Sequence, residues 1–305
     1  MNYSIGFPNL NIFFEHVGKS FTVFGYSIAF YGVVIAIGMI AGVTFITKEA
    51  KRCGYKEDDF FDICIWTIVM GIIGARFYYV AFSWDLYKGD IKSILNIRQG
   101  GLGIYGGIIF GIITVIILCK IKKIKALRAF DICFFGVIIG QIAGRWGNFF
   151  NREAFGGYSD GLLAMALPTS AVRSYSDITT EMVDHLLTIN GVDYVTVHPT
   201  FLYESLWNLM ILVIMLIVSR HKKFDGQVAF IYLGGYGIGR FWIESLRTDQ
   251  LLLWNTTIPV SMVVATIMVV IAVVGSVISY RKTKPTRDFE KKLNAIKNGG
   301  TSEED

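Results

Sequence analysis

Residues 144–157 read GRWGNFFNREAFGG, and this stretch closes an apolar run that begins near Asp131. It therefore places Arg145, two asparagines and Glu153 where an apolar helix is about to leave the membrane. An arginine at hydrocarbon depth costs about 3 kcal/mol on membrane-insertion scales. A chain tolerates such a charge mainly where the charge has a partner or a function, so this stretch marks a candidate site.

The composition of the whole chain indicates a membrane protein. The 305 residues have a mean hydropathy of +0.51, and 17% of them are charged, whereas soluble domains carry about 25% charged residues. Apolar stretches of about twenty residues recur along the chain, and each is long enough to cross a bilayer. We therefore predict an all-α polytopic membrane protein rather than a soluble α/β enzyme. The net charge of +5 predicts no nucleic-acid partner, because the basic residues fall in short loops.

The apolar stretches predict about seven transmembrane helices. They lie near residues 21–46, 60–82, 102–120, 130–150, 200–219, 227–245 and 256–280. Lysine and arginine gather in alternate connections, at residues 48–56, 120–128, 220–223 and 281–284. Basic loops favour the cytoplasmic side. The pattern therefore predicts an outside N-terminus and a cytoplasmic C-terminus.

The chain divides into a membrane domain and a tail. We expect residues 1–281 to form a membrane-embedded domain and residues 282–305 to form a charged cytoplasmic tail. The connection between the fourth and fifth spans, residues 151–199, is long for a passive loop. Its aliphatic residues and tyrosines favour a small external subdomain over a disordered loop.

The cysteines and histidines indicate no metal site. The four cysteines show no CxxC spacing, and the four histidines are scattered without an HExxH pattern. We therefore expect neither a metal ion nor another cofactor, and a disulfide framework or a cysteine nucleophile is not expected either.

Polar residues gather in the outer half of the predicted bundle. This set, drawn from six spans, comprises Tyr31, Arg76, Tyr105, Arg145, Asn148, Glu204 and Arg240. Helical spacing adds two stripes, one of Gln141, Arg145 and Asn148 and one of Tyr236, Arg240, Glu244 and Arg247. In the second stripe, Glu244 follows Arg240 by four residues and is its expected ion-pair partner.

Gathered arginines at this depth suggest binding of a phosphate. Guanidinium is always charged and binds phosphate with two parallel hydrogen bonds, and outer-leaflet phospholipid is the nearest phosphate. The alternative is that each arginine only extends its head to the interface. Matching depth for Arg145 with Asn148, and for Arg240 with Glu244, favours a lipid-headgroup site.

The motifs resemble those of a known family. The stretch GRWGNFFNREAFGG is similar to the signature of the prolipoprotein diacylglyceryl transferases. Further blocks fit the same family in the same order: FYG at 30–32, GARFYY at 74–79, IYGG at 104–107, HPTFLYE at 198–204 and YGIGRFWIESLR at 236–247.

The resemblance implies an activity and a place. It implies that phosphatidylglycerol donates its diacylglyceryl group to the lipobox cysteine of a preprolipoprotein signal peptide, with release of glycerol phosphate. The enzyme would be a multi-pass protein of the bacterial plasma membrane, in contact with membrane lipid, and its active site would face the outer leaflet. The implied catalytic residues are Arg145, Arg240, Glu244, Glu204 and Tyr105. The implied substrate-binding residues are Arg145, Asn148, Asn151, Glu153, Gly156, Tyr31, Arg76, Tyr236, Arg247 and His198.

One position departs from the family pattern. Tyr105 stands where many members have a histidine, and a neutral tyrosine with a pKa near 10 is a poor base at pH 7. Tyr105 therefore either positions substrate or has its pKa lowered by a neighbouring arginine. Outside this family, the competing predictions are a lipid transporter or flippase and a phospholipid-headgroup transferase of another type, some of which use magnesium. The chain shows neither the internal repeat of many transporters nor the clustered aspartates that magnesium requires.

Overall fold

The computed structural model describes residues 3–97, 100–253 and 256–299. The chain forms two compact units, one of Met1–Gly42 with Val137–Asp305 and one of Val43–Gly136. The division falls inside two long helices, α1 (Phe30–Arg52) and α5 (Ala126–Asn151). Each unit is described separately below.

Six helices are long and apolar enough to cross a membrane. They are α1, α2 (Glu57–Phe82), α4 (Ile104–Ile121), α5, α7 (Thr200–Ser219) and the part Val260–Thr286 of α9 (Val260–Gly299). Helix α8 (Gln227–Glu244) occupies the predicted sixth span but is not among these six. A mostly helical chain with several candidate spans is thus confirmed, and the count of seven stays a prediction.

The predicted first span is wrong at its start. Residues 21–29 belong to the antiparallel hairpin of β3 (Ser20–Val23) and β4 (Tyr26–Ala29), and α1 begins only at Phe30. Phe24 and Gly25 both have positive φ, 49° and 81°, as the two-residue turns that suit a twisted hairpin require. Tyr31 therefore lies in the first turn of α1.

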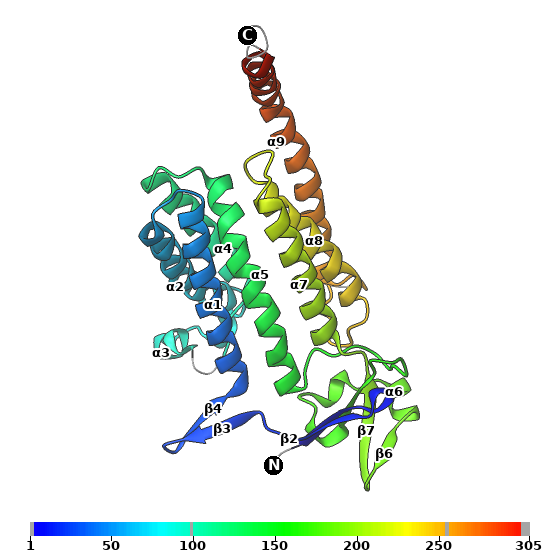
Figure 1. Cartoon of the computed structure of the whole chain (residues 1–305). Coiled ribbons are helices and arrows are strands. Elements are labelled where there is room, and N and C mark those ends of the chain that lie inside the picture. The colour runs from blue at the N-terminus through cyan, green and yellow to red at the C-terminus, as the bar shows by residue number, and fades with distance from the viewer. Residues whose placement is uncertain (1–2, 98–99, 254–255, 300–305) are drawn as a thin grey trace. The chain divides into compact units, whose positions relative to one another are not determined.

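A five-stranded sheet forms most of the β-structure of the first unit (Figure 1). Its order is β2-β1-β5-β7-β6, with antiparallel neighbours, and its strands are β1 (Tyr3–Phe7), β2 (Ile12–Val17), β5 (Met165–Pro168), β6 (Leu187–Ile189) and β7 (Val192–Val197). Short elements accompany the sheet: η1 (Pro8–Leu10), η4 (Thr169–Ala171), η5 (Tyr175–Asp177) and α6 (Thr180–Asp184). The predicted subdomain of residues 151–199 contributes three of these strands, and the N-terminus, which the prediction did not include, contributes two.

The core under this sheet joins it to the bundle. Ile5, Leu167 and Val195 from the strands are fully buried together with Phe149 of α5 and Phe201 of α7. Burying such side chains stabilises the fold by about 1.5–3 kcal/mol each. The core therefore anchors the sheet to the end of α5 and the start of α7.

Helices α7, α8 and α9 run side by side in the first unit (Figure 1). Glycines make the close contacts possible. A Cβ atom on Gly239 would lie 2.2 Å from the Trp207 ring of α7, and one on Gly237 would lie 2.8 Å from the Ala265 carbonyl of α9. Small residues allow such approach between membrane helices.

In the second unit, α2 packs along α4, and the connection between them carries η2 (Trp84–Leu86) and α3 (Ile91–Leu95). A Cβ atom on Gly106 would lie 2.2 Å from the Gly74 carbonyl oxygen, so the two backbones touch. At the other end of these helices, a separate apolar cluster includes Phe60, Ile63 and Cys119.

Candidate active site

Glu204 joins three helices of the first unit. It lies in the second turn of α7, and only 3% of the residue is exposed. Its Oε2 atom lies 2.7 Å from Nη2 of Arg145 on α5, and its Oε1 atom lies 2.9 Å from Nη1 of Arg240 on α8. A buried carboxylate needs such partners, because an isolated charge in a low-dielectric interior is strongly destabilising.

The predicted stripe on α8 continues this network. Arg240 Nη2 lies 2.5 Å from Glu244 Oε2, so the ion pair expected from the four-residue spacing is present. Arg247 lies 3.8 Å from the same Glu244 oxygen and binds Asp249 through two N–H groups at 2.9 and 2.8 Å. Three guanidinium groups and three carboxylates thus alternate in a chain, and their formal charges cancel.

The two arginines that share Glu204 are less buried than the carboxylates that hold them. The side chains of Arg145 and Arg240 are 20% and 16% exposed, whereas those of Glu204 and Glu244 are 4% exposed. A guanidinium group has five N–H donors, and the carboxylates bind only some of them. The carboxylates therefore bind one side of each of these two guanidinium groups, and the exposed part of each remains accessible to an anion.

Tyr236 lies between Arg145 and a hydrogen-bonded pair formed by Tyr232 and Gln141. The Tyr236 side chain lies near the Arg145 guanidinium, and its ring stacks on Tyr232 with centroids 5.7 Å apart. The Tyr232 hydroxyl accepts a hydrogen bond of 2.9 Å from Gln141 Nε2 on α5. Tyr232 was absent from the sequence prediction, although its position four residues before Tyr236 places it on the same stripe.

Two predicted asparagines converge on Glu153. The amide groups of Asn148 and Asn151 each donate a hydrogen bond of 3.1 Å to Glu153 Oε1. The other Glu153 oxygen forms an ion pair with Arg173, which precedes α6 and is 64% exposed. Arg173 was not predicted, because a partner twenty residues away in an irregular segment follows no helical spacing.

Gly156 lies where three backbone segments meet. Its N–H donates to the His198 carbonyl at 3.0 Å, and the N–H of Gly157 donates to the Leu246 carbonyl at 2.8 Å. A Cβ atom on Gly156 would lie 2.8 Å from His198 Cβ and 2.9 Å from the Leu246 carbonyl oxygen. Glycine is required here because a side chain would separate the end of α8 from the start of α7.

His198 and Tyr31 border the same region. The His198 Nδ1 atom lies 3.4 Å from the Tyr203 hydroxyl, and burial lowers the pKa of the imidazole from its ordinary value. Tyr31 lies against α5, because a Cβ atom on Gly147 would be 2.5 Å from its ring. The first unit thus brings together ten of the predicted residues: Tyr31, Arg145, Asn148, Asn151, Glu153, His198, Glu204, Tyr236, Arg240 and Glu244, with Gly156 and Arg247 beside them.

Arg76 and Tyr105 belong to the second unit. All five N–H groups of Arg76 donate to backbone carbonyls of the connection between α2 and α4, those of Ser93, Ile94, Asn96, Gly100 and Gly101, at 2.6–3.2 Å. Its guanidinium carbon also lies 4.9 Å from the centre of the Tyr87 ring. Tyr105 is the second residue of α4, and its ring lies 6.3 Å from that of Tyr78.

The described residues show no cluster of metal ligands. No group of three or more histidine, cysteine, aspartate or glutamate side chains lies close enough to hold a metal ion within residues 3–97, 100–253 and 256–299. The site described above is instead built from guanidinium, carboxylate, amide and phenol groups.

Comparison with known proteins identifies relatives along most of the chain. The family model described as prolipoprotein diacylglyceryl transferase matches residues 19–278. A phosphatidylglycerol–prolipoprotein diacylglyceryl transferase of Clostridioides difficile is 42% identical over 86% of this chain and 93% of its own length. Proteins with the same name from Finegoldia magna and Staphylococcus aureus are 40% and 34% identical, over 86% and 94% of this chain and 95% and 97% of their own lengths.

Proposed function

The chain belongs to the prolipoprotein diacylglyceryl transferase family, and from that premise we propose the reaction and its residues. The chain is a transferase that moves the diacylglyceryl group of phosphatidylglycerol to a prolipoprotein, which is the first step of bacterial lipoprotein maturation. The acceptor is the thiol of the lipobox cysteine in the signal peptide. The identity and coverage of the relatives support this activity, and the arginine network supports the mechanism that follows.

The reaction exchanges one bond at a glycerol carbon. The cysteine sulfur attacks the carbon of the diacylglyceryl group that carries the phosphate, and a C–S bond forms as the C–O bond breaks. The phosphate oxygen keeps the electron pair and leaves as glycerol phosphate, while the thiol proton passes to water. A free cysteine has a pKa of about 8.5, so deprotonation and charge on the leaving phosphate are the two demands on the site.

Arg145 and Arg240 meet the second demand. The observation that carries this assignment is the shared Glu204, which holds guanidinium groups from α5 and α8 at 2.7 and 2.9 Å while each stays partly exposed. Preorganised donors stabilise charge that develops in a transition state, and loss of one such donor typically costs about 100- to 1,000-fold in rate. The two arginines would bind the phosphodiester and stabilise the charge on its departing oxygen.

Glu204 and Glu244 act on the arginines. Both oxygens of Glu204 lie in ion pairs, and Glu244 contacts Arg240 and Arg247. We assign Glu204 and Glu244 as positioning residues that orient Arg145 and Arg240, the pair that we call the phosphate clamp. This assignment is preferred to the alternative that either carboxylate accepts the thiol proton. Arg247, held by Asp249, completes the row, and Tyr236 orients Arg145.

The segment after α5 would recognise the headgroup. Asn148, Asn151 and Glu153 form a hydrogen-bonded set beside the clamp, and these groups match the hydroxyls of a glycerol headgroup. Gly156 and His198 shape the backbone around this set, and Tyr31 of α1 packs on Gly147 of α5, one residue before Asn148.

Arg76 and Tyr105 receive different proposals. Because carbonyl groups already engage all five N–H donors of Arg76, we propose that it organises the connection between α2 and α4 and does not bind a headgroup. Tyr105 stays a proposed substrate-positioning residue. Its test is Tyr105→Phe, because retained transfer by this variant would exclude the phenol as an essential base.

The orientation in the membrane is also a proposal. Alternating basic loops support a cytoplasmic C-terminus and place the arginine network in the outer half of the bundle. Residues 151–199 would then form an external subdomain of the bacterial plasma membrane enzyme, and residues 282–305 a cytoplasmic tail whose described part, up to Gly299, continues α9. Labelling of single cysteines in residues 151–199 with membrane-impermeant reagents in whole cells would test this, since absence of labelling there would overturn it.

A reconstituted reaction tests the activity directly. Purified protein is mixed with phosphatidylglycerol and a lipobox peptide, and the peptide mass is measured. We expect a gain of one diacylglyceryl group, and no gain for a matched peptide with serine in place of cysteine. An unchanged cysteine peptide would refute the transferase and favour a lipid transporter.

A further inference from the structure

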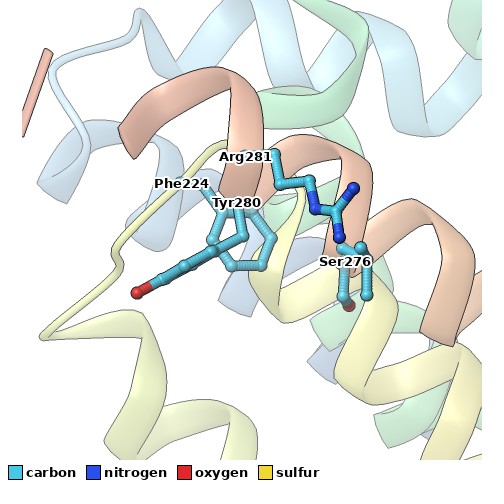
Figure 2. A pocket seen from close by; sticks show the side chains of 5 residues that line it. Phe224, Ser276, Tyr280 and Arg281 are labelled. Carbon is cyan, nitrogen blue, oxygen red and sulfur yellow. The ribbon is translucent and has the colours of Figure 1, made fainter. Parts of the chain in front are cut away.

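A pocket lies in the first unit, beside the start of α8 and residues 276–281 of α9, away from the arginine network. Its lining residues are Phe224 from the connection between α7 and α8 and Ser276, Val277, Tyr280 and Arg281 from α9, and its volume is about 290 Å³ (Figure 2). Arg240 follows Gly226 at the start of α8 by fourteen residues, which at 1.5 Å per residue is about 20 Å. The pocket is therefore separate from the candidate active site.

The walls of this pocket suit a hydrocarbon chain. The Phe224 and Tyr280 rings meet edge to face with centroids 6.2 Å apart. Val277 and Tyr280 are exposed on α9. This helix is the most apolar of the six candidate spans, and only 11% of its apolar stretch is buried inside the protein. The pocket thus opens toward the surroundings of α9, where a bilayer would place lipid chains.

The rim of this pocket is cationic. Arg281 follows Tyr280 directly, and within the part of the chain whose side chains are described, no carboxylate forms an ion pair with it. Lys282 and Lys284 follow on α9, and the connection that carries Phe224 holds the basic residues 220–223 together with one carboxylate, Asp225. Basic groups at the cytoplasmic end of a membrane helix attract anionic lipids by about 1 kcal/mol each.

We propose that this pocket binds one anionic phospholipid of the cytoplasmic leaflet, with a chain against Phe224, Val277 and Tyr280 and its phosphate on Arg281. In a phospholipid the hydrocarbon chains are followed by a phosphate. The pocket has the same order, since its apolar residues are followed by the Arg281 guanidinium. The lipid would act as a bound structural ligand and not as the diacylglyceryl donor. The choice of leaflet depends on the orientation proposed above, whereas the choice of ligand depends on the pocket alone.

Native mass spectrometry of the full chain with added phosphatidylglycerol tests this proposal. We expect the wild-type chain to retain two lipids, one on the clamp and one in the pocket. Arg281→Gln removes the rim charge, and Val277→Trp fills the pocket without changing charge, so each should retain one lipid. Lys282→Gln is the matched control: it removes one charge of the same sign near the pocket but none of the lining residues, so it should weaken the attraction only slightly and still retain two lipids.

Combination with the clamp separates the two sites. The variant Arg145→Ala with Arg240→Ala should keep the pocket lipid, and adding Arg281→Gln should leave none. Retention of two lipids by both Arg281→Gln and Val277→Trp would overturn the proposal. Equal retention of phosphatidylethanolamine, displacement by inorganic phosphate, or a dimer mass that disappears in Val277→Trp would overturn it as well, since each identifies a different occupant.

Transfer activity gives an independent readout. Arg281→Gln and Val277→Trp should transfer diacylglyceryl groups at rates within about twofold of the wild type, because helix α8 separates the pocket from the clamp by about 20 Å. Lipid retention does not require turnover. A wild-type chain without transferase activity that still retains the pocket lipid would therefore refute the proposed function and leave this inference intact.

Discussion

Arg76 and Arg240 are arginines of apolar helices with opposite kinds of partner. Five backbone carbonyls surround Arg76, and 8% of the residue is exposed. Arg240 instead lies between the carboxylates of Glu204 and Glu244, with 16% of its side chain exposed. The first guanidinium holds a loop in place, whereas the second is itself held in place.

The difference shows how the partner of a membrane arginine indicates its function. Carbonyl groups that use every N–H donor leave no capacity for a ligand. Carboxylates compensate the charge, fix the orientation and leave donors on the far side of the guanidinium. This contrast supports the proposal that a phosphate binds Arg145 and Arg240, whereas binding to Arg76 would require the connection between α2 and α4 to rearrange.

The largest expected effect is on the carboxylate-held arginines. Arg145→Ala or Arg240→Ala should reduce transfer by about 100- to 1,000-fold, because each removes a preorganised donor to the leaving phosphate. Transfer is measured in membranes with labelled phosphatidylglycerol. Arg→Lys at either position should recover only part of the rate, since lysine keeps the charge and loses the two-pronged geometry. Near-normal turnover by both alanine variants would refute the clamp.

The carbonyl-bound arginine should affect stability instead. Arg76→Ala removes five hydrogen bonds to a charged donor, and each such bond contributes about 1.5–3 kcal/mol, so we expect a loss of at least about 3 kcal/mol in unfolding free energy. Thermal unfolding in detergent measures it. The transfer rate per folded molecule should stay within a few-fold of the wild type. An unchanged melting temperature with abolished transfer would show that Arg76 binds substrate and that the contrast with Arg240 fails.

Loss of the hydrogen bond between Gln141 and Tyr232 should have an intermediate effect on the transfer rate. Gln141→Leu and Tyr232→Phe each break the hydrogen bond that supports the Tyr236 ring, and we expect each to lower kcat by up to about tenfold with little change in KM. The double variant should be no worse than the worse single one, because both remove the same interaction. Ser205→Ala, whose hydroxyl donates to the nearby Ile142 carbonyl at 3.4 Å, is the control. Fully additive losses would contradict a shared role.

The exposed ion pair should have a smaller effect. Arg173→Ala removes the partner of Glu153, and an exposed pair of this kind contributes about 0.2–1 kcal/mol to stability. We expect the melting temperature to change little and KM for phosphatidylglycerol to rise about two- to fivefold, because Glu153 loses one of its three partners. Arg173→Lys should restore KM, and a collapse of kcat would place Arg173 inside the clamp instead.

The smallest expected effect is the pH dependence from His198. Burial lowers the pKa of His198 below its ordinary value of 6.5. The unfolded chain therefore binds more protons than the folded chain as the pH falls through 6.5, and stability decreases in that direction. Melting curves at successive pH values should show a shallower decrease for His198→Gln. An identical pH slope in both proteins would exclude this contribution.

The sequence predicted the helical part of the site well. Tyr236, Arg240 and Glu244 lie on α8, and the Arg240–Glu244 pair lies where the four-residue spacing placed it. Arg247 lies beyond the end of the helix, where it pairs with Gly156 in a β-bridge. The depth argument also brought Glu204 to the level of both arginines. Local geometry explains this success, since residues four apart on a helix are neighbours whatever the rest of the chain does.

The sequence predicted the strands and the loop contacts poorly. Residues 21–29 are apolar enough to pass as the start of a span, yet they pair as β3 and β4. The N-terminal strand β1 pairs with β5, about 160 residues later, and no local pattern indicates that pairing. The carbonyl ligands of Arg76 are likewise invisible, because every residue has a carbonyl group and only the path of the backbone aims it.

The sequence by itself determined that apolar helices carry an arginine-rich polar stripe, because hydrophobic length and helical periodicity are local properties. Its motifs resemble those of the prolipoprotein diacylglyceryl transferases, and that resemblance indicated the family. Only the tertiary structure decided which arginines share a carboxylate and which one is enclosed by carbonyls. Those partners come from different helices and from irregular loops, so their distances depend on packing and not on position along the chain.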